Sequence, residues 1–317
     1  MRILLTGATS FTGYWFAKSL SEAGHDLVMP IRGDASAYEG RRGDRARALA
    51  SFGRIETGVV FGDDRFLDLA ADPAGWDLLA HHAAEVRDYH SPDFDVASAV
   101  ASNTNRVREV LGRLRDNGCR RILATGSVFE GGEGAGSDGL PSFSPYGLSK
   151  SLSWQVIEFH ARAAGFAAGK FVIPNPFGPF EEPRFTAYLM KTWHAGQAAG
   201  IRTPEYVRDN IHVDLLAKTY VRFAEEMPES RSTVQLSPSG YIESQATFAE
   251  RFAAAMRSRL DLDCRLEYGR QEHFDEPRIR IGTTPATSLV PDWSDDVAWD
   301  AVAQYYAAQF EPTTTAG

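Results

Sequence analysis

The first half of the chain alternates between short apolar runs and segments in which apolar residues recur every three or four positions. Short apolar runs that end in glycine or polar residues are typical of buried parallel strands, whereas the recurring spacing is typical of amphipathic helices. Because helical patterns separate most of the runs, we expect an α/β protein with a doubly wound parallel sheet. The predicted strands cover residues 2–6, 26–31, 59–63, 76–84, 121–129 and 171–179.

Three connecting segments have recognisable patterns of their own. Residues 34–54 are rich in Arg and Gly and predict a loop with an exposed helix. Asn103 is expected to open a helix that ends at Gly118. The Gly-rich residues 130–143 predict a flexible loop before a long helix that begins near Ser144.

The alternation of strands and helices weakens after residue 175. A helix over 215–224 and a strand over 233–236 continue the earlier pattern, so we expect this part of the chain to return to the first domain. The predicted division is residues 1–174 with 214–237 for the first domain, 175–213 with 238–310 for a smaller C-terminal α/β lobe, and 311–317 for a disordered tail.

The composition is ordinary for a soluble globular enzyme, with 43% hydrophobic and 24% charged residues among 317. The net charge of −9 disfavours nucleic acid or an anionic membrane as a partner. No apolar run approaches the roughly 20 residues of a membrane span, and the short apolar start does not match a signal peptide. Cys119 and Cys264 lie far apart without the spacing of metal ligands, so we expect no metal and two reduced thiols in a cytoplasmic protein.

Residues 6–13, Thr-Gly-Ala-Thr-Ser-Phe-Thr-Gly, connect the first strand to the first helical pattern. In such a unit Gly7 permits the tight turn, Gly13 lets helix and strand pack closely, and free N–H groups at the helix start can bind a pyrophosphate. The alternative is a glycine turn without a ligand, which the strand before it and the helix after it disfavour. The residues expected to contact a dinucleotide here are Gly7, Thr9, Ser10, Phe11, Thr12 and Gly13.

Tyr146 and Lys150 lie four positions apart at the start of the long helical pattern, so they share one face of the helix. A free Tyr has a pKa near about 10 and is a poor base at neutral pH, but a neighbouring positive charge favours the phenolate. Lowering that pKa by about 3 units takes about 4 kcal/mol, which a partly solvated Lys150 does not supply alone. We therefore expect a second cation beside Tyr146, such as an oxidised nicotinamide ring.

The glycine turn and the Tyr-x-x-x-Lys pair resemble motifs of the extended short-chain dehydrogenase/reductase family, of the nucleotide-sugar epimerase/dehydratase type. In its Thr-Gly-x-x-Gly-x-x-Gly fingerprint, Ser10 stands in place of the middle Gly. The resemblance covers about residues 1–225 and implies a Rossmann-type sheet with a substrate-binding lobe. Four further segments follow in family order: His-x-Ala-Ala at 81–84, the strand-end Thr125, Asn-Pro-Phe-Gly-Pro at 175–179 and Arg-Asp-x-Ile-His-Val at 208–213.

The resemblance implies a nicotinamide dinucleotide as cofactor. Family members specific for NAD tend to carry an acidic residue near position 32 that accepts from the ribose 2′-OH. Arg32 instead offers a guanidinium suited to a 2′-phosphate, so we expect NADP(H) to be favoured over NAD(H); a solvated Arg is the alternative. A solvated helix cap is likewise the alternative for Asn103. Further implied cofactor contacts are Asp63 beside the adenine, Ala83 and Ala84 at a strand end, Asn103 and Lys150 near the nicotinamide-side ribose, and Tyr146, Pro174 and Phe177 near the nicotinamide.

The resemblance also implies the roles of the reacting groups. Thr125 would donate a hydrogen bond to the C4 oxygen of a sugar, and Ser127 is the second candidate because it lies on the same face of the strand. Tyr146 would transfer the proton while Lys150 tunes its pKa. In related 4,6-dehydratases an Asp-Glu pair follows this Thr; here Gly126 and Ser127 take those places, which argues against dehydration. Implied substrate contacts are Glu85 and Ser127 near the sugar, and Asn175 and Arg208 near the diphosphate.

These residues lead to three hypotheses about function, with a nucleotide-diphospho sugar as substrate in the first two. Because of Arg32 we favour a 4-keto-sugar reductase that consumes NADPH. The same residues serve a nucleotide-sugar 4-epimerase with tightly bound NAD, which is the close alternative. A catalytically silent cofactor-binding regulator is the third, and the intact Thr125, Tyr146 and Lys150 argue against it.

Two helices suggest how the chain assembles. The helix after Asn103 and the helix of Tyr146 resemble the pair that forms a four-helix bundle between family subunits. We therefore expect a homodimer, with ordinary core packing of these helices as the alternative.

Overall fold

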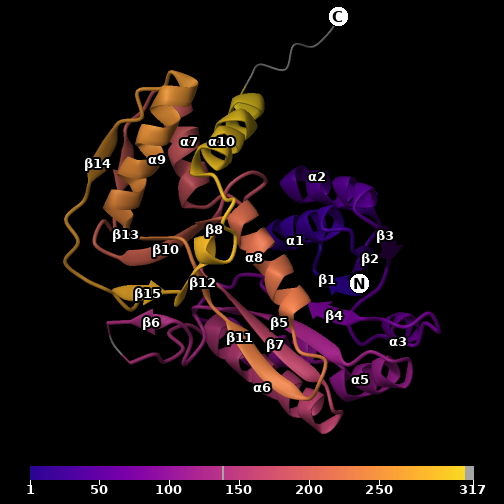
Figure 1. The fold of residues 1–317 in the computed structure, drawn as a ribbon. Helices are drawn as coiled ribbons and strands as arrows, with labels where there is room; N and C mark the ends of the chain where they lie inside the picture. Colours follow the sequence, from indigo (N-terminus) through magenta and orange to yellow (C-terminus); the bar gives the residue numbers. More distant parts are fainter. Residues whose placement is uncertain (138, 311–317) are drawn as a thin grey trace, which may run out of the picture.

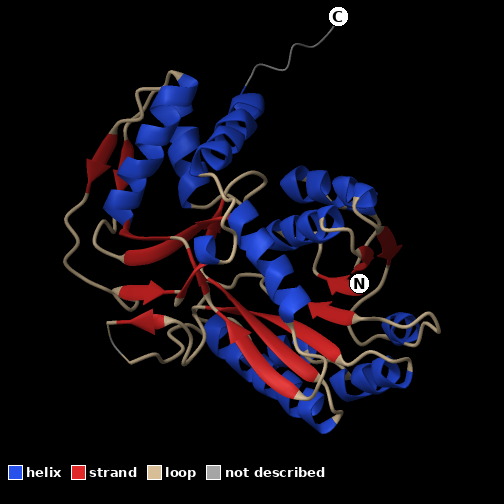
Figure 2. Ribbon diagram, in the orientation of Figure 1, coloured by secondary structure: helices blue, strands red, loops and turns tan. Residues whose placement is uncertain are grey.

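A parallel sheet built from strands between residues 2 and 236 is the central feature of the fold (Figures 1 and 2). The computed structural model describes residues 1–137 and 139–310. The strands of this sheet are β1 (Arg2–Thr6), β2 (Asp26–Ile31), β3 (Arg54–Thr57), β4 (Leu78–His81), β5 (Arg121–Ser127), β7 (Ala167–Ile173) and β11 (Ser232–Leu236). Within the described residues they form a seven-stranded sheet in the order β11-β7-β5-β4-β1-β2-β3. Strands β2 and β3 extend the sheet on one side of β1, whereas β4 and the later strands extend it on the other side. This reversal confirms the predicted Rossmann-type doubly wound sheet.

Helices cover both faces of the sheet because successive side chains of each strand point to opposite sides. One face carries α1 (Phe11–Glu22), α2 (Gly40–Ala48) and α8 (Val213–Glu226), and the other carries α3 (Asp64–Ala70), α4 (Val96–Asn103), α5 (Val107–Asp116) and α6 (Pro145–Ala163). Ile3 and Leu5 of β1 belong to an apolar cluster with α1 and α8, whereas Leu4 belongs to a second cluster with α5 and α6.

A smaller lobe contains a second sheet (Figure 1), and an apolar cluster separate from those of the large sheet forms its core. In this sheet β13 (Tyr241–Ser244), β10 (Val207–His212), β15 (Ile279–Ile281) and β6 (Ala135–Gly136) follow one another, and β8 (Asn175–Phe177) pairs with β10. Its helices are α7 (Phe185–His194), α9 (Gln245–Leu260) and α10 (Asp295–Phe310). The remaining short elements are the pairs β9 (Ala199–Ile201) with β14 (Leu266–Tyr268) and β12 (Pro238–Ser239) with β16 (Thr284–Pro285), and the 3₁₀ helices η1 (Ala35–Ala37), η2 (Leu49–Ser51) and η3 (Ala286–Ser288).

The predicted domain division stays a prediction. Helix α8 and strand β11, from the segment predicted to return, pack in the layers of the large sheet. Strand β6 differs, because it lies within residues predicted for the first domain and pairs with β15 of the smaller lobe. The predicted tail over 311–317 lies outside the described residues.

Glycine conformations shift the third strand from its predicted position. The third strand in the chain is β3, whereas residues 59–63, where the sequence predicted it, form a turn. Gly58 and Gly62 have φ of +66° and +77°, a region that favours glycine and interrupts an extended strand. Asp63 then caps α3, since its side chain accepts a hydrogen bond from the N–H of Phe66 at 2.7 Å.

Two predicted helices also differ from the structure. Asn103 ends α4 and does not open a helix, because Arg106 has a φ of +47° and interrupts the helical path before α5. Helix α2 is exposed on one side and buried on the other. Its Arg45 is fully buried and donates to the carbonyl oxygens of Thr9 at 3.0 Å and Phe180 at 2.7 Å.

Buried charges hold Glu130 and Glu133 in place, although both lie in the stretch that the sequence predicted to be a flexible loop. The Lys170 ammonium on β7 lies 2.6 Å from a carboxylate oxygen of Glu130 and 2.5 Å from one of Glu133. All three side chains are buried. Arg280 on β15 is also buried and donates to the carbonyl oxygen of Glu133 at 3.2 Å. These contacts tie the segment both to the large sheet and to the smaller lobe.

Replacing Lys170 by Met should destabilise the fold by about 3–5 kcal/mol, because removing one partner of a buried ion cluster leaves the others uncompensated. Urea unfolding followed by circular dichroism measures the change. The control is Lys191→Met on α7, where the side chain is exposed and the expected change is within about 0.5 kcal/mol. Equal stability of the two variants would show that the buried cluster does not hold the fold together.

Candidate active site

A cavity of about 720 Å³ opens at the carboxyl ends of the strands of the large sheet, where the strand order reverses. Its lining runs from Arg32 after β2, past the glycine turn, to Thr125 on β5 and to Tyr146 and Lys150 on α6. Doubly wound sheets bind ligands at this reversal point, and the volume lies within the roughly 300–1,000 Å³ of small-molecule sites. One continuous cavity therefore joins the predicted cofactor turn and the predicted catalytic residues.

Thr6, the last residue of β1, holds the end of β4 against the glycine turn. Its Oγ1 accepts hydrogen bonds from the N–H groups of His82 at 3.1 Å and Ala83 at 3.0 Å, and it lies 3.1 Å from Nδ1 of His81. The two backbones approach so closely that a Cβ on Gly7 would lie 2.7 Å from the nitrogen of Ala83. With a φ of +76° as well, this position requires glycine.

Ser10, the residue that departs from the family fingerprint, caps helix α1. Its Oγ accepts from the N–H of Gly13 at 3.1 Å and donates to the carbonyl oxygen of Gly7 at 2.9 Å. Phe11 and Thr12, at the start of the helix, line the cavity, so the helix N-terminus is available to an anionic group. Gly13 does not line the cavity and serves packing instead, because a Cβ there would lie 2.2 Å from the oxygen of Gly7.

The end of the cavity beyond β2 carries several guanidinium groups. Arg32, Arg42 and Arg45 line it together with Tyr38. Arg42 lies 4.9 Å over the Tyr38 ring and donates to Oγ1 of Thr9 at 3.0 Å. Burial lowers the pKa of Arg42, and the positive charges of Arg32 and Arg45 lower it further. Tyr38 and Arg42 were not predicted from the sequence, and the Arg-rich composition of residues 34–54 was the signal for Arg42.

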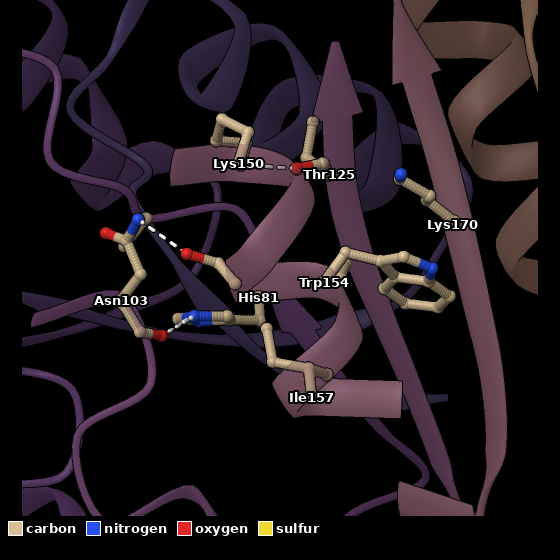
Figure 3. A pocket seen from close by; sticks show the side chains of 10 residues that line it. His81, Asn103, Thr125, Lys150, Trp154, Ile157 and Lys170 are labelled. Carbon is tan, nitrogen blue, oxygen red and sulfur yellow. Dashed lines mark hydrogen bonds between the residues drawn. The ribbon is translucent and has the colours of Figure 1, made fainter. Parts of the chain in front are cut away.

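Tyr146 and Lys150 stand on the first two turns of α6. Ser144 caps this helix by accepting from the N–H of Gly147 at 3.1 Å. The Lys150 ammonium donates to the carbonyl oxygen of Thr125 at 2.6 Å, which joins α6 to β5 (Figure 3). Burial lowers the pKa of Lys150. The structure thus brings Thr125, Tyr146 and Lys150 to one end of the cavity, as the sequence predicts.

The charge that acts on Tyr146 differs from the expected one. Burial raises the pKa of the Tyr146 hydroxyl, and Glu130 raises it further, whereas Arg184 lowers it. The Lys150 ammonium is hydrogen-bonded to the backbone of β5. Arg184 lines the cavity and lies 5.8 Å over the ring of Tyr89, which in turn lies 5.3 Å from the ring of Tyr146. A single Arg in an irregular segment gives no sequence signal, so Arg184 was missed.

The two adjacent histidines at the end of β4 make different contacts. Nε2 of His81 lies 3.0 Å from the carbonyl oxygen of Asn103 (Figure 3), and Nδ1 of His82 lies 2.9 Å from Oγ1 of Thr125. Burial lowers the pKa of His81 to about 4 and that of His82 to about 3, so both rings are neutral at pH 7. The Asn103 side chain accepts from the N–H of Glu85 at 2.7 Å and so positions the segment after β4. In residues 1–137 and 139–310, no three His, Cys, Asp or Glu side chains gather as a metal site.

Most of the predicted site residues line the cavity. Those that do are Gly7, Thr9, Ser10, Phe11, Thr12, Arg32, Ala83, Ala84, Glu85, Asn103, Thr125, Ser127, Tyr146, Lys150, Pro174 and Asn175.

Asp63, Phe177 and Arg208 have other surroundings, and their predicted ligand contacts stay predictions. Asp63 caps α3, and Phe177 stacks on Trp299 at 5.4 Å in the core of the smaller lobe. The Arg208 guanidinium lies 2.9 Å from a carboxylate oxygen of Glu276 and donates to nearby carbonyl oxygens. None of the three is part of the cavity lining.

Comparison with known proteins agrees with this arrangement. A model of the NAD dependent epimerase/dehydratase family matches residues 3–235. No curated protein sequence matches the chain.

Solved structures share the fold at low sequence identity. UDP-glucuronic acid 4-epimerase from Bacillus cereus, in complex with UDP-glucuronic acid and NAD, is 17% identical with a TM-score of 0.73, over 98% of this chain and 100% of that one. UDP-glucose 4-epimerase from Thermotoga maritima is 17% identical with a TM-score of 0.71, over the same shares of the two chains. UDP-glucose-4-epimerase from Stenotrophomonas maltophila, with bound NAD and formylated UDP-arabinopyranose, is 16% identical with a TM-score of 0.75, over 98% of each chain.

The neutral histidines predict an acid limit of stability. A His whose pKa is lowered to about 4 in the fold stabilises the protein fully above its unfolded pKa of about 6.5, and this contribution is lost as the pH falls from there towards 4. His81→Asn cannot take up this proton. Its free energy of unfolding should therefore fall less steeply with acidification than that of the wild type, by up to roughly 1.4 kcal/mol per pH unit. Guanidinium unfolding at pH 7, 6 and 5 measures both slopes, and parallel slopes would contradict a buried neutral His81.

Proposed function

We propose that this chain, which belongs to the NAD-dependent epimerase/dehydratase family, acts as a nucleotide-sugar 4-epimerase. One observation carries the proposal. The same cavity is lined by the glycine turn and by Thr125, Tyr146 and Lys150. The similar solved structures are 4-epimerases of UDP-linked sugars, two of them with bound NAD. They support the epimerase better than the 4-keto-sugar reductase that Arg32 favoured. The catalytically silent regulator has no observation in its favour.

The residues around the cavity fit a nicotinamide dinucleotide. The start of α1 suits its pyrophosphate, and the closely packed Gly7 leaves the backbone free of side-chain atoms at this point. Ala83 and Ala84 form a wall of small side chains between the turn and the catalytic residues. When bound, the cofactor supplies reversible hydride transfer at the sugar carbon.

The chain's own residues then handle the proton of the sugar hydroxyl. Tyr146 accepts it as a phenolate and later returns it. Burial opposes this ionisation, so the positive charges of Arg184 and of a bound cofactor are needed to favour it. Lys150 holds the Thr125 backbone and keeps the reacting end of β5 in place. Glu85, Ser127 and Asn175 line the part of the cavity left for the sugar and its diphosphate.

Exposed apolar side chains on α6 are what a partner subunit would cover. Leu148, Leu152 and Phe159 are 43%, 37% and 58% exposed. The homodimer through a four-helix bundle stays a prediction.

Among the described residues, no helix is long and apolar enough to cross a membrane.

Tyr146→Phe should lower C4 epimerisation of a UDP-linked sugar by about 10²- to 10⁴-fold, because it removes the proton-transferring hydroxyl. Conversion of UDP-glucose and of UDP-glucuronic acid to their C4 epimers, followed by chromatography, measures the rate. Tyr188→Phe is the matched control, since Tyr188 lies on α7 with 43% of its surface exposed and does not line the cavity. Wild-type rates in Tyr146→Phe would exclude both the epimerase and the reductase.

The basic end of the cavity supports NADP(H) as the preferred cofactor, although the similar structures hold NAD. Arg42 and Arg32 offer guanidinium groups suited to a 2′-phosphate. Arg42→Ala should weaken NADPH binding by roughly tenfold or more, in line with one lost charged hydrogen bond, and should leave NADH binding within about twofold. Fluorescence titration of the reduced nicotinamide measures both affinities. Tighter wild-type binding of NADH than of NADPH would overturn this preference and leave the epimerase proposal standing.

A further inference from the structure

Arg45 on α2 joins two separate parts of the cavity wall through one buried guanidinium. Its Nε donates to the carbonyl oxygen of Thr9 in the glycine turn at 3.0 Å. Nη1 donates to the carbonyl oxygen of Phe180 at 2.7 Å, and Nη2 lies 2.5 Å from a carboxylate oxygen of Glu182. Thr9 follows β1 of the large sheet, whereas Glu182 lies between β8 and α7 of the smaller lobe, and both line the cavity.

Residues 179–184, which we call the bridging segment, are held by side chains of α1 and α2. Three successive carbonyl oxygens of this segment accept hydrogen bonds from these helices. The donors are Trp15 to Pro179 at 2.9 Å, Arg45 to Phe180 at 2.7 Å and Arg41 to Glu181 at 2.8 Å. Phe180 has a φ of +66°, a left-handed conformation that a residue other than Gly keeps where its surroundings determine it, often at a ligand site. The bridging segment is thus a fixed part of the cavity wall.

Arg45 reaches the glycine turn as well as the bridging segment. Its charge is compensated by Glu182, whereas its neighbour Arg42 donates to the hydroxyl of Thr9 at 3.0 Å. A guanidinium presents its donors in a rigid planar fork. Arg45 therefore cannot follow a shift of Thr9 without changing its hydrogen bonds to the bridging segment. The position of the glycine turn and that of the bridging segment depend on each other.

The bridging segment ends beside the reacting end of the cavity. Its last residue, Arg184, lies 5.8 Å over the ring of Tyr89, and that ring lies 5.3 Å from the ring of Tyr146. Arg184 lines the cavity together with Pro183 before it and Phe185 after it. A displacement of the bridging segment therefore moves side chains next to Tyr146, where the substrate is expected.

We propose that Arg45 is a positioning residue that makes cofactor and substrate bind cooperatively: a dinucleotide on the glycine turn fixes Thr9, and Arg45 then holds the bridging segment in place for the sugar nucleotide. The identity of the substrate in this statement rests on the proposed function. Coupling between two sites is reciprocal, so the substrate strengthens cofactor binding by the same factor. Such coupling suits a 4-epimerase, because neither ligand should leave between the two hydride transfers.

Hydrogen–deuterium exchange, read by mass spectrometry, tests the link with the cofactor alone. In the wild type, NADPH should slow exchange of the backbone amides in residues 180–188 by roughly fivefold, the lower end of usual coupling factors. In Arg45→Lys this slowing should disappear although NADPH still binds, since an ammonium keeps the charge but lacks the fork that reaches three acceptors. Equal slowing in Arg45→Lys, which would indicate direct protection by the cofactor, or no slowing in the wild type would overturn the proposal.

Calorimetric binding of UDP, with and without saturating NADPH, tests the consequence for the substrate. NADPH should strengthen UDP binding to the wild type by roughly fivefold or more, and by less than about twofold in Arg45→Lys. A substitution that only lowers stability would leave this factor unchanged, because the factor is a ratio of two affinities of the same folded protein. The wild-type factor in Arg45→Lys would contradict the proposal.

Two further variants keep the outcomes distinguishable. Arg47→Lys, an exposed position on the same helix, should keep the wild-type factor. Glu182→Gln removes the carboxylate that faces Arg45 and should lower the factor, and it provides the test if Arg45→Lys fails to fold. NADH replaces NADPH in both experiments if the wild type binds it more tightly. If UDP does not bind the wild type, the proposed substrate class is wrong, and the exchange result still decides the role of Arg45.

Discussion

The site depends on the hydrogen bonds that the Thr6 hydroxyl accepts, because they fix the ends of strands β1 and β4 to each other. The hydroxyl accepts from two successive N–H groups after β4 and so sets where the chain leaves the sheet. The glycine turn then passes within a few ångströms of Ala83, which only Gly7 permits. The N-terminus of α1 lines the cavity next to this junction. His82, on the other side of the junction, lies within hydrogen-bonding distance of Thr125.

Charge is distributed unevenly around this junction, although the chain as a whole carries a net charge of −9. Guanidinium groups line the cavity, with Arg42 at the cofactor end and Arg184 beside Tyr146. The carboxylates of Glu130 and Glu133 are held behind the site by Lys170. A cavity with positive charge at both ends suits a ligand with several phosphates and a base that must become a phenolate.

The sequence predicted the layers of the fold well because the strands of a buried parallel sheet are continuous apolar runs. It failed where glycine conformation, not hydrophobicity, decided the outcome, as at Gly58 and Gly62. Motifs that resemble those of the family pointed to Thr125, Tyr146 and Lys150, and all three line the cavity. The sequence did not locate Arg42 on α2 or Arg184 before α7, because the place of both side chains in the cavity depends on tertiary packing.

We propose that this site inverts a sugar carbon by passing a hydride out and back, without net use of cofactor. The most direct measurement follows the absorbance of reduced nicotinamide and the C4 configuration of UDP-glucose or UDP-glucuronic acid in the same reaction. The account predicts that the C4 epimer accumulates to equilibrium while the amount of reduced cofactor shows no net change. Stoichiometric oxidation of NADPH by a nucleotide-linked 4-keto sugar, with no interconversion of C4 epimers, would contradict it.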